Sequence, residues 1–158
     1  MLRPGELARR LAVSDGEPDI AGLPCDRIIA TDGSEIMYRF HLAEGRRAIR
    51  FHHLMASDPG RDFHDHPWDF TSRLLSGMYI EHTLQGTIVY RAPCVIGRRA
   101  EQLHRLELPE GPVWSYVVTG RPRRRWGFQT AEYGWVAWQE YPAAGQYAPC
   151  GDEDGRSW

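Results

Sequence analysis

The stretch RDFHDHPWDF, residues 61–70, places two histidines one residue apart among acidic side chains. In a β-strand, residues i and i+2 point to the same face. His64 and His66 would therefore direct two imidazoles into one space, while Asp65 between them points away. Neutral imidazole is a ligand for zinc, iron, nickel and copper. The pair alone is a weak signal in a chain with seven histidines, but its geometry predicts the first half of a metal site.

Two ligands from one strand need a third from another part of the chain. His104 lies in the run EQLHRLEL, in which it alternates with Leu106 and Leu108. These three side chains would share one face of a strand, and the leucines make that face the core. An isolated core histidine is usually held by hydrogen bonds, but one that can meet a histidine pair is a candidate ligand. We therefore predict one divalent metal ion on His64, His66 and His104.

The composition is that of a globular protein of ordinary size. The chain has 158 residues, 42% apolar and 25% charged, which suits one domain with its own hydrophobic core. The net charge of −2 argues against bulk binding to nucleic acid. No apolar run reaches the length of a membrane span, and the N-terminus has no signal-peptide core. We expect a cytoplasmic protein whose partner is a small-molecule substrate, without nucleic acid or membrane partners; a homodimer is an open alternative.

The chain contains three cysteines, Cys25, Cys94 and Cys150. Their number is odd, their spacing is wide, and no CxxC pair is present. Reduced thiols are the expected state for such a set in a cytosolic protein.

The spacing of apolar residues and the positions of Gly and Pro predict one short helix followed by many strands. The helix covers residues 6–12, where Leu7 and Leu11 stand four apart. Residues 14–26 have the composition of a loop, and Ser76-Gly77 suggests a hairpin turn. Short β-like runs separated by Gly and Pro turns cover residues 35–42, 48–55, 70–75, 78–84, 87–92, 103–108, 114–120 and 135–141. This pattern predicts an all-β sandwich or barrel. The expected divisions are an N-terminal helix and loop (1–34), a β-domain (35–141) and a polar C-terminal tail (142–158).

A histidine pair on an early strand, a glycine turn after it and a lone histidine some forty residues later resemble the cupin superfamily. Its usual first motif is G-x5-H-x-H-x3,4-E-x6-G, and His64, His66 and Gly77 fit that spacing. The second motif, G-x5-P-x-G-x2-H-x3-N, keeps His104 alone. The resemblance covers about residues 35–141 and implies a double-stranded β-helix, or jelly roll. The runs HDHPWDF and RRRWGF are also similar to those of small bacterial and phage cupin-like proteins.

The cupin motif reserves one position for a glutamate ligand, and this chain has Phe70 or Thr71 there. The resemblance therefore implies a three-histidine centre, as in cysteine-dioxygenase-like cupins, where Fe(II) takes substrate and dioxygen directly. Alternatively, another strand supplies the carboxylate. If Ser76-Gly77 forms a hairpin, Glu81 shares a face with Ser72 and is a candidate fourth ligand. Asp69 is a second candidate; its alternatives are a turn cap or an acceptor that orients a ligating imidazole.

Other side chains are candidates for binding substrate. Arg73 interrupts an apolar strand and could hold a substrate carboxylate, although a surface arginine is at least as good an interpretation. His52 and His53 face opposite ways on one strand; we take His53 as the candidate general base, with a satisfied core histidine as the alternative. Tyr79 is a candidate for the pocket wall, with plain core packing as the alternative. The basic run RPRRR at 121–125 is expected to form a solvated loop, with contact to an anionic ligand at the barrel mouth as the alternative.

These features together predict a metal-dependent cupin enzyme. The leading hypothesis is an Fe(II) dioxygenase, an oxidoreductase that acts on a small polar organic acid or amino-acid-like substrate. One alternative is a non-redox isomerase, epimerase or lyase that uses Zn, Ni or Mn to polarise a carbonyl. Another is a cupin that binds a ligand without turnover. The fold alone does not decide among them.

Overall fold

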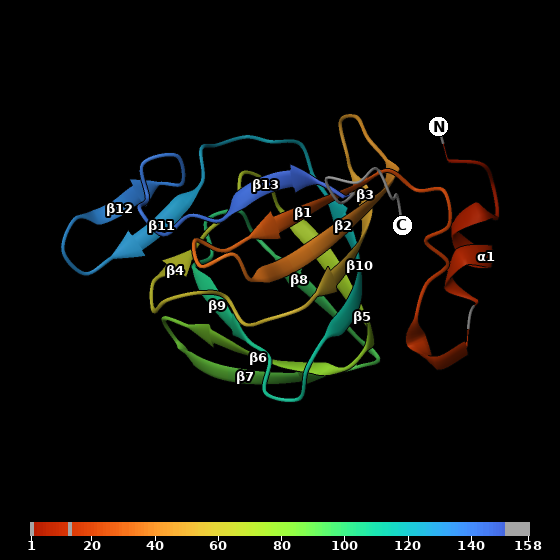
Figure 1. The fold of residues 1–158 in the computed structure, drawn as a ribbon, viewed down its shortest axis with the longest axis horizontal. Coiled ribbons are helices and arrows are strands. Elements are labelled where there is room, and N and C mark those ends of the chain that lie inside the picture. The colour runs from red at the N-terminus through yellow and green to blue at the C-terminus, as the bar shows by residue number, and fades with distance from the viewer. Residues whose placement is uncertain (1, 13, 151–158) are drawn as a thin grey trace.

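Two β-sheets face each other and form the body of the protein (Figure 1). The computed structural model describes residues 2–12 and 14–150. Sheet A contains β1 (Cys25–Ile29), β2 (Glu35–Ala43), β3 (Ile49–Leu54), β5 (Phe70–Ser76), β8 (Cys94–Arg98), β10 (Val113–Thr119) and β13 (Gln146–Pro149). Sheet B contains β4 (Phe63–His64), β6 (Met78–Thr83), β7 (Gly86–Arg91), β9 (His104–Glu107), β11 (Gly127–Thr130) and β12 (Gly134–Ala137). The predicted all-β jelly-roll sandwich is confirmed.

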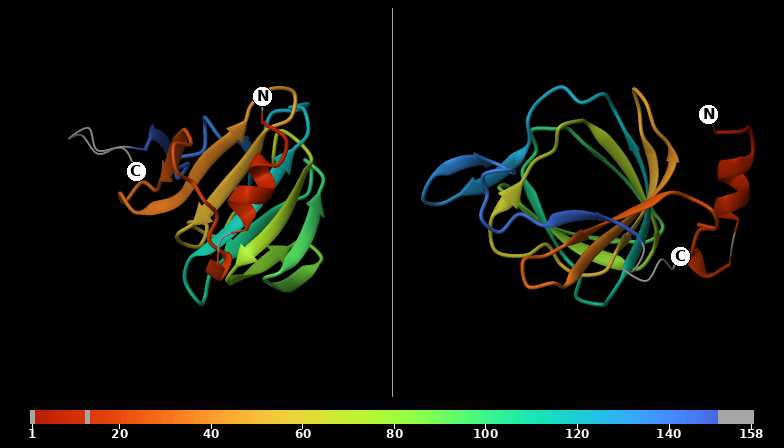
Figure 2. Two further views of the ribbon diagram at one scale, coloured as in Figure 1. Left: turned by 90° about the vertical axis from the view of Figure 1, so that its right-hand side faces the viewer. Right: turned by 45° about the horizontal axis from the view of Figure 1, so that its top comes forward.

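The order of the strands is β13-β1-β2-β3-β10-β5-β8 in sheet A and β12-β11-β4-β9-β6-β7 in sheet B. All recorded pairings are antiparallel. The hairpin of β11 and β12 projects from one side of the sandwich, and α1 (Glu6–Leu11) lies at the opposite side (Figures 1 and 2). A short 3₁₀ turn, η1 (Ser14–Gly16), follows the helix. None of the helices in the described part of the chain is long and apolar enough to cross a membrane.

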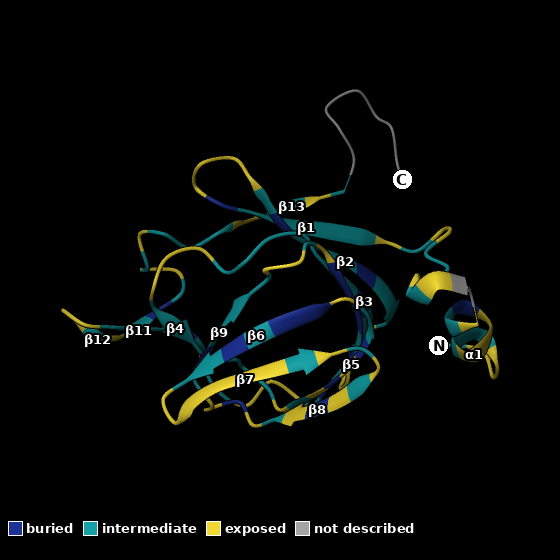
Figure 3. Ribbon diagram, turned by 90° about the horizontal axis from the view of Figure 1, so that it is seen from below, coloured by how far each residue is buried: buried dark blue, intermediate teal, exposed yellow. Residues whose placement is uncertain are grey.

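Sheet A is buried on both of its faces near its centre. On the inner face, a cluster of Leu74, Tyr79, Ile96 and Val113 joins the two sheets. On the outer face, a second cluster contains Phe40, Phe51 and Trp114, and Leu7 and Leu11 of α1 pack against it. The predicted helix and its apolar stripe are thus confirmed. Figure 3 shows the contrast between buried β6 and exposed β7, which is an edge strand of sheet B.

The expected hairpin at Ser76-Gly77 is wrong. β5 belongs to sheet A and β6 to sheet B, so the turn carries the chain from one sheet to the other. Gly77 has φ +81°, and a Cβ there would lie 2.9 Å from the carbonyl oxygen of Pro112. Glycine meets both demands because it tolerates positive φ and has no side chain. A tight turn with glycine has the same local signature in a hairpin and in a crossover between sheets.

The predicted boundaries of the β-domain are too narrow. β1 lies inside the segment expected to be helix and loop, and β13 lies inside the segment expected to be a polar tail. β13 pairs with β1, and β1 pairs with β2, so both extend sheet A. β8 and β11 were not predicted as strands either. The rest of the predicted tail, residues 151–158, lies outside the described residues.

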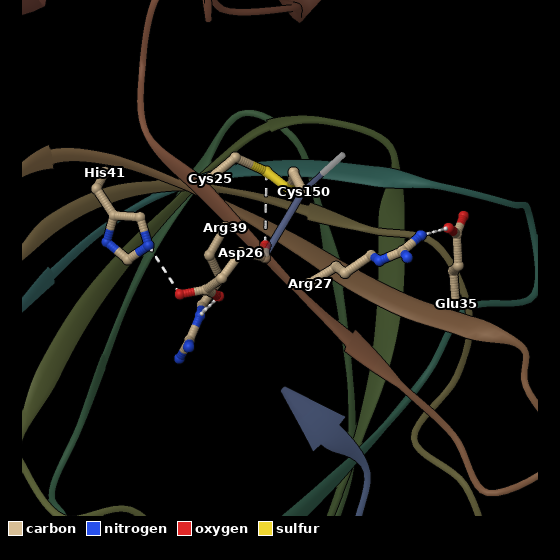
Figure 4. Close-up of a disulfide and its surroundings, with 7 residues drawn as sticks. All are labelled: Cys25, Asp26, Arg27, Glu35, Arg39, His41 and Cys150. Atoms are coloured by element: carbon tan, nitrogen blue, oxygen red, sulfur yellow. Dashed lines mark hydrogen bonds and ion pairs between the residues drawn. A yellow bond between two sulfur atoms is a disulfide. The ribbon is translucent and has the colours of Figure 1, made fainter. Parts of the chain in front are cut away.

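Cys25 and Cys150 form a disulfide that ties β1 to the end of β13 (Figure 4). The expectation of three reduced thiols is therefore wrong for this pair, while Cys94 is free. The two cysteines are 125 residues apart. They meet because antiparallel pairing of β1 with β13 sets their backbones side by side, which no local pattern in the sequence announces.

Replacing both Cys25 and Cys150 with serine is expected to lower the free energy of unfolding by about 2–4 kcal/mol, because the disulfide restricts a long loop in the unfolded chain. Denaturant titration measures the loss. Cys94→Ser is the matched control, since this thiol is unpaired, and it should change stability little. Three free thiols per chain in the denatured, unreduced protein would contradict the disulfide.

Candidate metal centre

Three histidine side chains converge between the two sheets. One nitrogen from each of His64, His66 and His104 lies within 4.8 Å of the others. The ring centroids are separated by 5.1 Å for His64 and His66, 4.8 Å for His64 and His104, and 5.0 Å for His66 and His104. His64 on β4 is the direct cross-strand partner of His104 on β9. The predicted meeting of the histidine pair with the lone histidine is thus present in the structure.

Asp65, between the two histidines, points away from the centre and anchors the turn that carries them. Its side chain is 2% exposed. One carboxylate oxygen accepts a hydrogen bond from the backbone N–H of Gly127 at 2.8 Å. The other accepts from the indole N–H of Trp135 at 2.9 Å and forms an ion pair with Arg124. The short β4 strand is therefore fastened to β11 and β12 from the side opposite the imidazoles.

The basic run at 121–125, which we expected to be a solvated loop, forms ion pairs. Besides the contact of Arg124 with Asp65, Arg123 pairs with Asp69 at 2.7 Å and with Glu101. Asp69 also accepts the backbone N–H of Ala100 at 2.8 Å. The structure therefore places Asp69 on an exposed loop as a brace, and it does not contribute to the group of metal-ligating nitrogens.

Glu81 is the buried carboxylate nearest to the centre, and it holds a ligand histidine. Its side chain is 1% exposed. Its Oε1 accepts a hydrogen bond from His104 Nδ1 at 2.6 Å and another from Arg98 Nε at 2.9 Å, and Oε2 pairs with Arg98 as well. Burial alone would raise the pKa of Glu81, but the hydrogen bonds from His104 and Arg98 lower it to about 2. Both oxygens are engaged, and Glu81 lies outside the group of converging nitrogens, which favours an orienting role; its role as a fourth ligand stays a prediction.

The residues present fit a divalent transition metal. His104 Nε2 and His66 Nδ1 are buried and have no hydrogen-bond partner among the described residues. Buried polar atoms are nearly always satisfied, so unpaired imidazole nitrogens in a converging group suggest ligation. Burial lowers the pKa of His66 well below its usual value and that of His64 to about 4. The imidazoles of His64 and His66 are therefore neutral at neutral pH, as metal ligation requires.

The three histidines open into a cavity of about 360 Å³ between the sheets. Aromatic side chains line it beside the histidines, namely Trp68, Phe70, Trp126 and Phe128. Its polar lining residues are Arg39, Arg50, His52, Asp58, Asp62, Ser72, Glu81, Arg98 and Ser115. Such a mainly apolar cavity with a few polar groups is the usual form of a small-molecule site.

Two of the three residues expected to act on substrate lie outside this cavity. Arg73 is exposed on the opposite face of β5, where it lines a small cleft with Leu11 and Glu17. His53 stacks on Trp114 of the outer cluster, with ring centroids 4.0 Å apart. Its neighbour His52 is the histidine of β3 that faces the cavity. The expected roles of Arg73 and His53 are therefore not supported, because each sits one position out of register with the inner face.

Tyr79 lines the cavity as expected. It lies on β6 two residues before Glu81, which gives the two side chains the same face. Burial raises the pKa of its hydroxyl strongly, so Tyr79 stays protonated. It also belongs to the inner hydrophobic cluster and packs edge-on against Tyr90.

The sequence did not indicate the role of Arg98, and it led us to name His53 as the cavity histidine, whereas His52 lines the cavity. Arg98 lies on β8, a strand that was not predicted, and its partner Glu81 is 17 residues away on the other sheet. No local pattern links the two. For His52 the signal was present, because alternation with Arg50 and Leu54 puts these side chains on one face, but the sequence does not say which face is inside.

Several solved structures have a fold similar to that of this chain. No protein-family model matches the chain, and no curated protein sequence matches it. The Clostridium difficile EutQ protein aligns with a TM-score of 0.51 at 12% identity, over 62% of this chain and 78% of that chain. A cupin superfamily protein from Desulfitobacterium hafniense DCB-2 aligns with a TM-score of 0.46 at 15% identity, over 54% and 77% of the two chains. The FeII HppE structure aligns with a TM-score of 0.48 at 10% identity, over 59% of this chain and 56% of that chain. The alignment with the EutQ protein supports a shared jelly-roll fold, and at 12% identity it speaks for the fold alone.

Glu81→Gln is expected to weaken metal binding about 10- to 100-fold, because it removes the charged acceptor that orients His104. The visible spectrum of the cobalt-substituted protein should keep its form, since the three ligating nitrogens are unchanged. Stability should fall by about 3 kcal/mol, because Arg98 loses its buried partner. Asp69→Asn is the control and should leave metal affinity nearly unchanged. A changed cobalt spectrum in Glu81→Gln would instead make Glu81 a ligand.

The metal-free protein is expected to lose stability as the pH falls from about 6.5 to 4. Burial lowers the pKa of His52, His64 and His66 in the folded chain, so the unfolded chain binds more protons in this window. His64 alone contributes up to about 3 kcal/mol, which is present above pH 6.5 and lost by pH 4. His41, whose pKa is raised by hydrogen bonding to Asp26, acts in the opposite direction. Urea titrations across this range measure the effect; a flat profile would contradict it.

Proposed function

We propose that the protein is a metal-dependent enzyme that holds one divalent ion on His64, His66 and His104. The finer proposal is an Fe(II) dioxygenase acting on a small polar organic acid or an amino-acid-like substrate. One observation carries it: three imidazoles converge inside a cavity without a carboxylate among them. The chain resembles three-histidine cupins in this respect.

The residues around the centre support this role in distinct ways. Glu81 fixes His104 in the tautomer with hydrogen on Nδ1, which leaves Nε2 free to ligate. Trp68, Phe70, Trp126 and Phe128 restrict water beside the histidines, which strengthens electrostatic interactions in the cavity. These contacts support the proposal, because they hold the three histidines rigidly and shield them from water beside a space that can hold a substrate.

A three-histidine donor set leaves the positive charge of the ion uncompensated. When bound, Fe(II) would supply one-electron redox chemistry and coordination positions open to a substrate donor and to dioxygen. An anionic substrate would complete the neutralisation of the site. This charge argument favours an acid over a neutral substrate.

Metal analysis of freshly purified protein is expected to give about one divalent ion per chain, with iron as the ion that supports turnover. His64→Ala, His66→Ala and His104→Ala should each abolish tight binding, because each removes one of three bonds. Wild-type metal affinity in all three variants would contradict the site.

A chelator should lower the melting temperature while the protein stays folded. Metal at a hundredfold excess over its dissociation constant stabilises the folded protein by about 2.7 kcal/mol, and the chelator removes this contribution.

Oxygen uptake separates the proposed chemistry from its alternatives. With iron bound, a panel of small organic acids and amino acids should include one that drives uptake of dioxygen in an oxygen electrode. Conversion of an acid without uptake, with Zn, Ni or Mn bound, would favour the isomerase, epimerase or lyase alternative. Binding without conversion would favour a ligand-binding cupin.

A further inference from the structure

The wall of the cavity formed by sheet A contains a cluster of basic side chains on β2 and β3. Arg39 is paired in register with His52, and His41 with Arg50. Residues 39 and 41, and residues 50 and 52, are each two apart, so the four side chains share one face. Arg39, Arg50 and His52 line the same cavity as the three ligand histidines. We call Arg39, His41, Arg50 and His52 the basic cluster.

Two carboxylates border the basic cluster. Asp26 accepts a hydrogen bond from Arg39 Nε at 2.7 Å and contacts His41 Nε2 at 2.9 Å (Figure 4). Glu44 contacts His41 Nδ1 and accepts from Arg50 Nε and Nη2 at 3.2 Å each. Both ring nitrogens of His41 face a carboxylate, and Arg50 Nε also lies 3.3 Å from His41 Nδ1. Each carboxylate is therefore shared between His41 and one arginine, so neither carboxylate serves an arginine alone.

Asp26 and Glu44 engage only some of the guanidinium nitrogens of Arg39 and Arg50. Arg39 engages Asp26 through Nε, and Arg50 engages Glu44 through Nε and Nη2. The terminal nitrogens of Arg39 and Nη1 of Arg50 lie outside these ion pairs. The Arg39 guanidinium lies 4.7 Å from the centre of the Tyr147 ring, which fixes its plane. Both side chains are mostly buried, 16% and 14% exposed, so their charge is poorly screened.

His52 adds an unsatisfied polar atom to the cluster. Its Nε2 is buried and has no hydrogen-bond partner within the described chain. Buried imidazole nitrogens are normally paired with a protein group or an ordered water, so Nε2 of His52 has room for a further hydrogen bond. The buried Ser115, its cross-strand neighbour on β10, extends this polar row along the cavity wall.

The other charged groups of the cavity are already engaged. Arg98 is held by Glu81 and by the hydroxyl of Tyr90. Asp58 accepts the backbone N–H of Leu106, and Asp62 accepts the hydroxyl of Tyr141. Arg98 has all of its guanidinium nitrogens engaged, whereas Arg39 and Arg50 keep donors outside their ion pairs.

We propose that Arg39, Arg50 and His52 form an anion-binding subsite that takes the carboxylate of a small acid with an apolar body. The arginine nitrogens and His52 Nε2 bind the carboxylate, and the body of the acid lies against the apolar lining between the cluster and the histidine centre. Naming this acid as the substrate rests on the proposed function, whereas anion binding by the subsite does not. The subsite replaces Arg73 as the group that recognises substrate charge.

Benzoate and its neutral isostere benzamide test the subsite in the metal-free protein, which is prepared with a chelator that is then removed. Calorimetric titration should show saturable binding of benzoate and binding of benzamide at least about tenfold weaker, because a hydrogen bond to a charged group is worth that factor or more. Arg39→Gln and Arg50→Gln should each weaken benzoate binding about tenfold, and His52→Phe should weaken it severalfold. Arg73→Gln is the matched control on the outer face and should leave binding unchanged.

The comparison of the two probes uses the wild-type protein, so it stands even if an arginine variant fails to fold. Equal affinity for benzoate and benzamide, or no saturable binding of benzoate, would overturn the proposal. Unchanged benzoate affinity in folded Arg39→Gln and Arg50→Gln would overturn it as well. His64→Ala should leave benzoate binding by the metal-free protein intact, and its loss would assign the anion to the histidine centre instead. A protein that binds benzoate in this way but no metal would refute the proposed function and leave the subsite standing.

Discussion

The carboxylate of Glu81 is buried between the sheets, where a charge is tolerated only if it is paired and fully hydrogen-bonded. It meets that demand with Arg98 of sheet A and His104 of sheet B. The same carboxylate thus joins the two sheets and sets the orientation of one candidate metal ligand. Because His104 lies directly opposite His64 across β4 and β9, the orientation of the His104 ring also sets its distance to the His64 ring.

The two sheets contribute different chemistry to one cavity. β4 and β9 of sheet B, with the residues just after β4, supply the three imidazoles. β2 and β3 of sheet A supply the basic cluster. Imidazole nitrogens on one wall and arginine donors on the other suit a ligand with one end for a metal and an anionic end for the arginines. The apolar lining between them limits the ligand to a small body.

Contacts outside the cavity hold both walls in place. Asp65 fastens the histidine strand to the β11–β12 hairpin through Trp135, Gly127 and Arg124. On the other wall, the disulfide joins β1 to β13 beside Asp26, which holds Arg39 (Figure 4). Asp65 lies between His64 and His66 in the sequence, and Asp26 directly follows Cys25 of the disulfide. Strand alternation explains this, since adjacent residues serve opposite faces.

The sequence by itself determined the class of fold, the N-terminal helix and the three histidines, because strand alternation and helical spacing are local and periodic. Only the tertiary structure decided which face of each strand is inside, and this is why Arg73 and His53 lie outside the cavity while Arg39, Arg50 and His52 line it. It also decided that Ser76-Gly77 is a crossover, that Glu81 serves His104, and that Cys25 meets Cys150. Each of these depends on residues far apart in the chain, whose contacts are set by how the sheets pack and not by the pattern around any one of them.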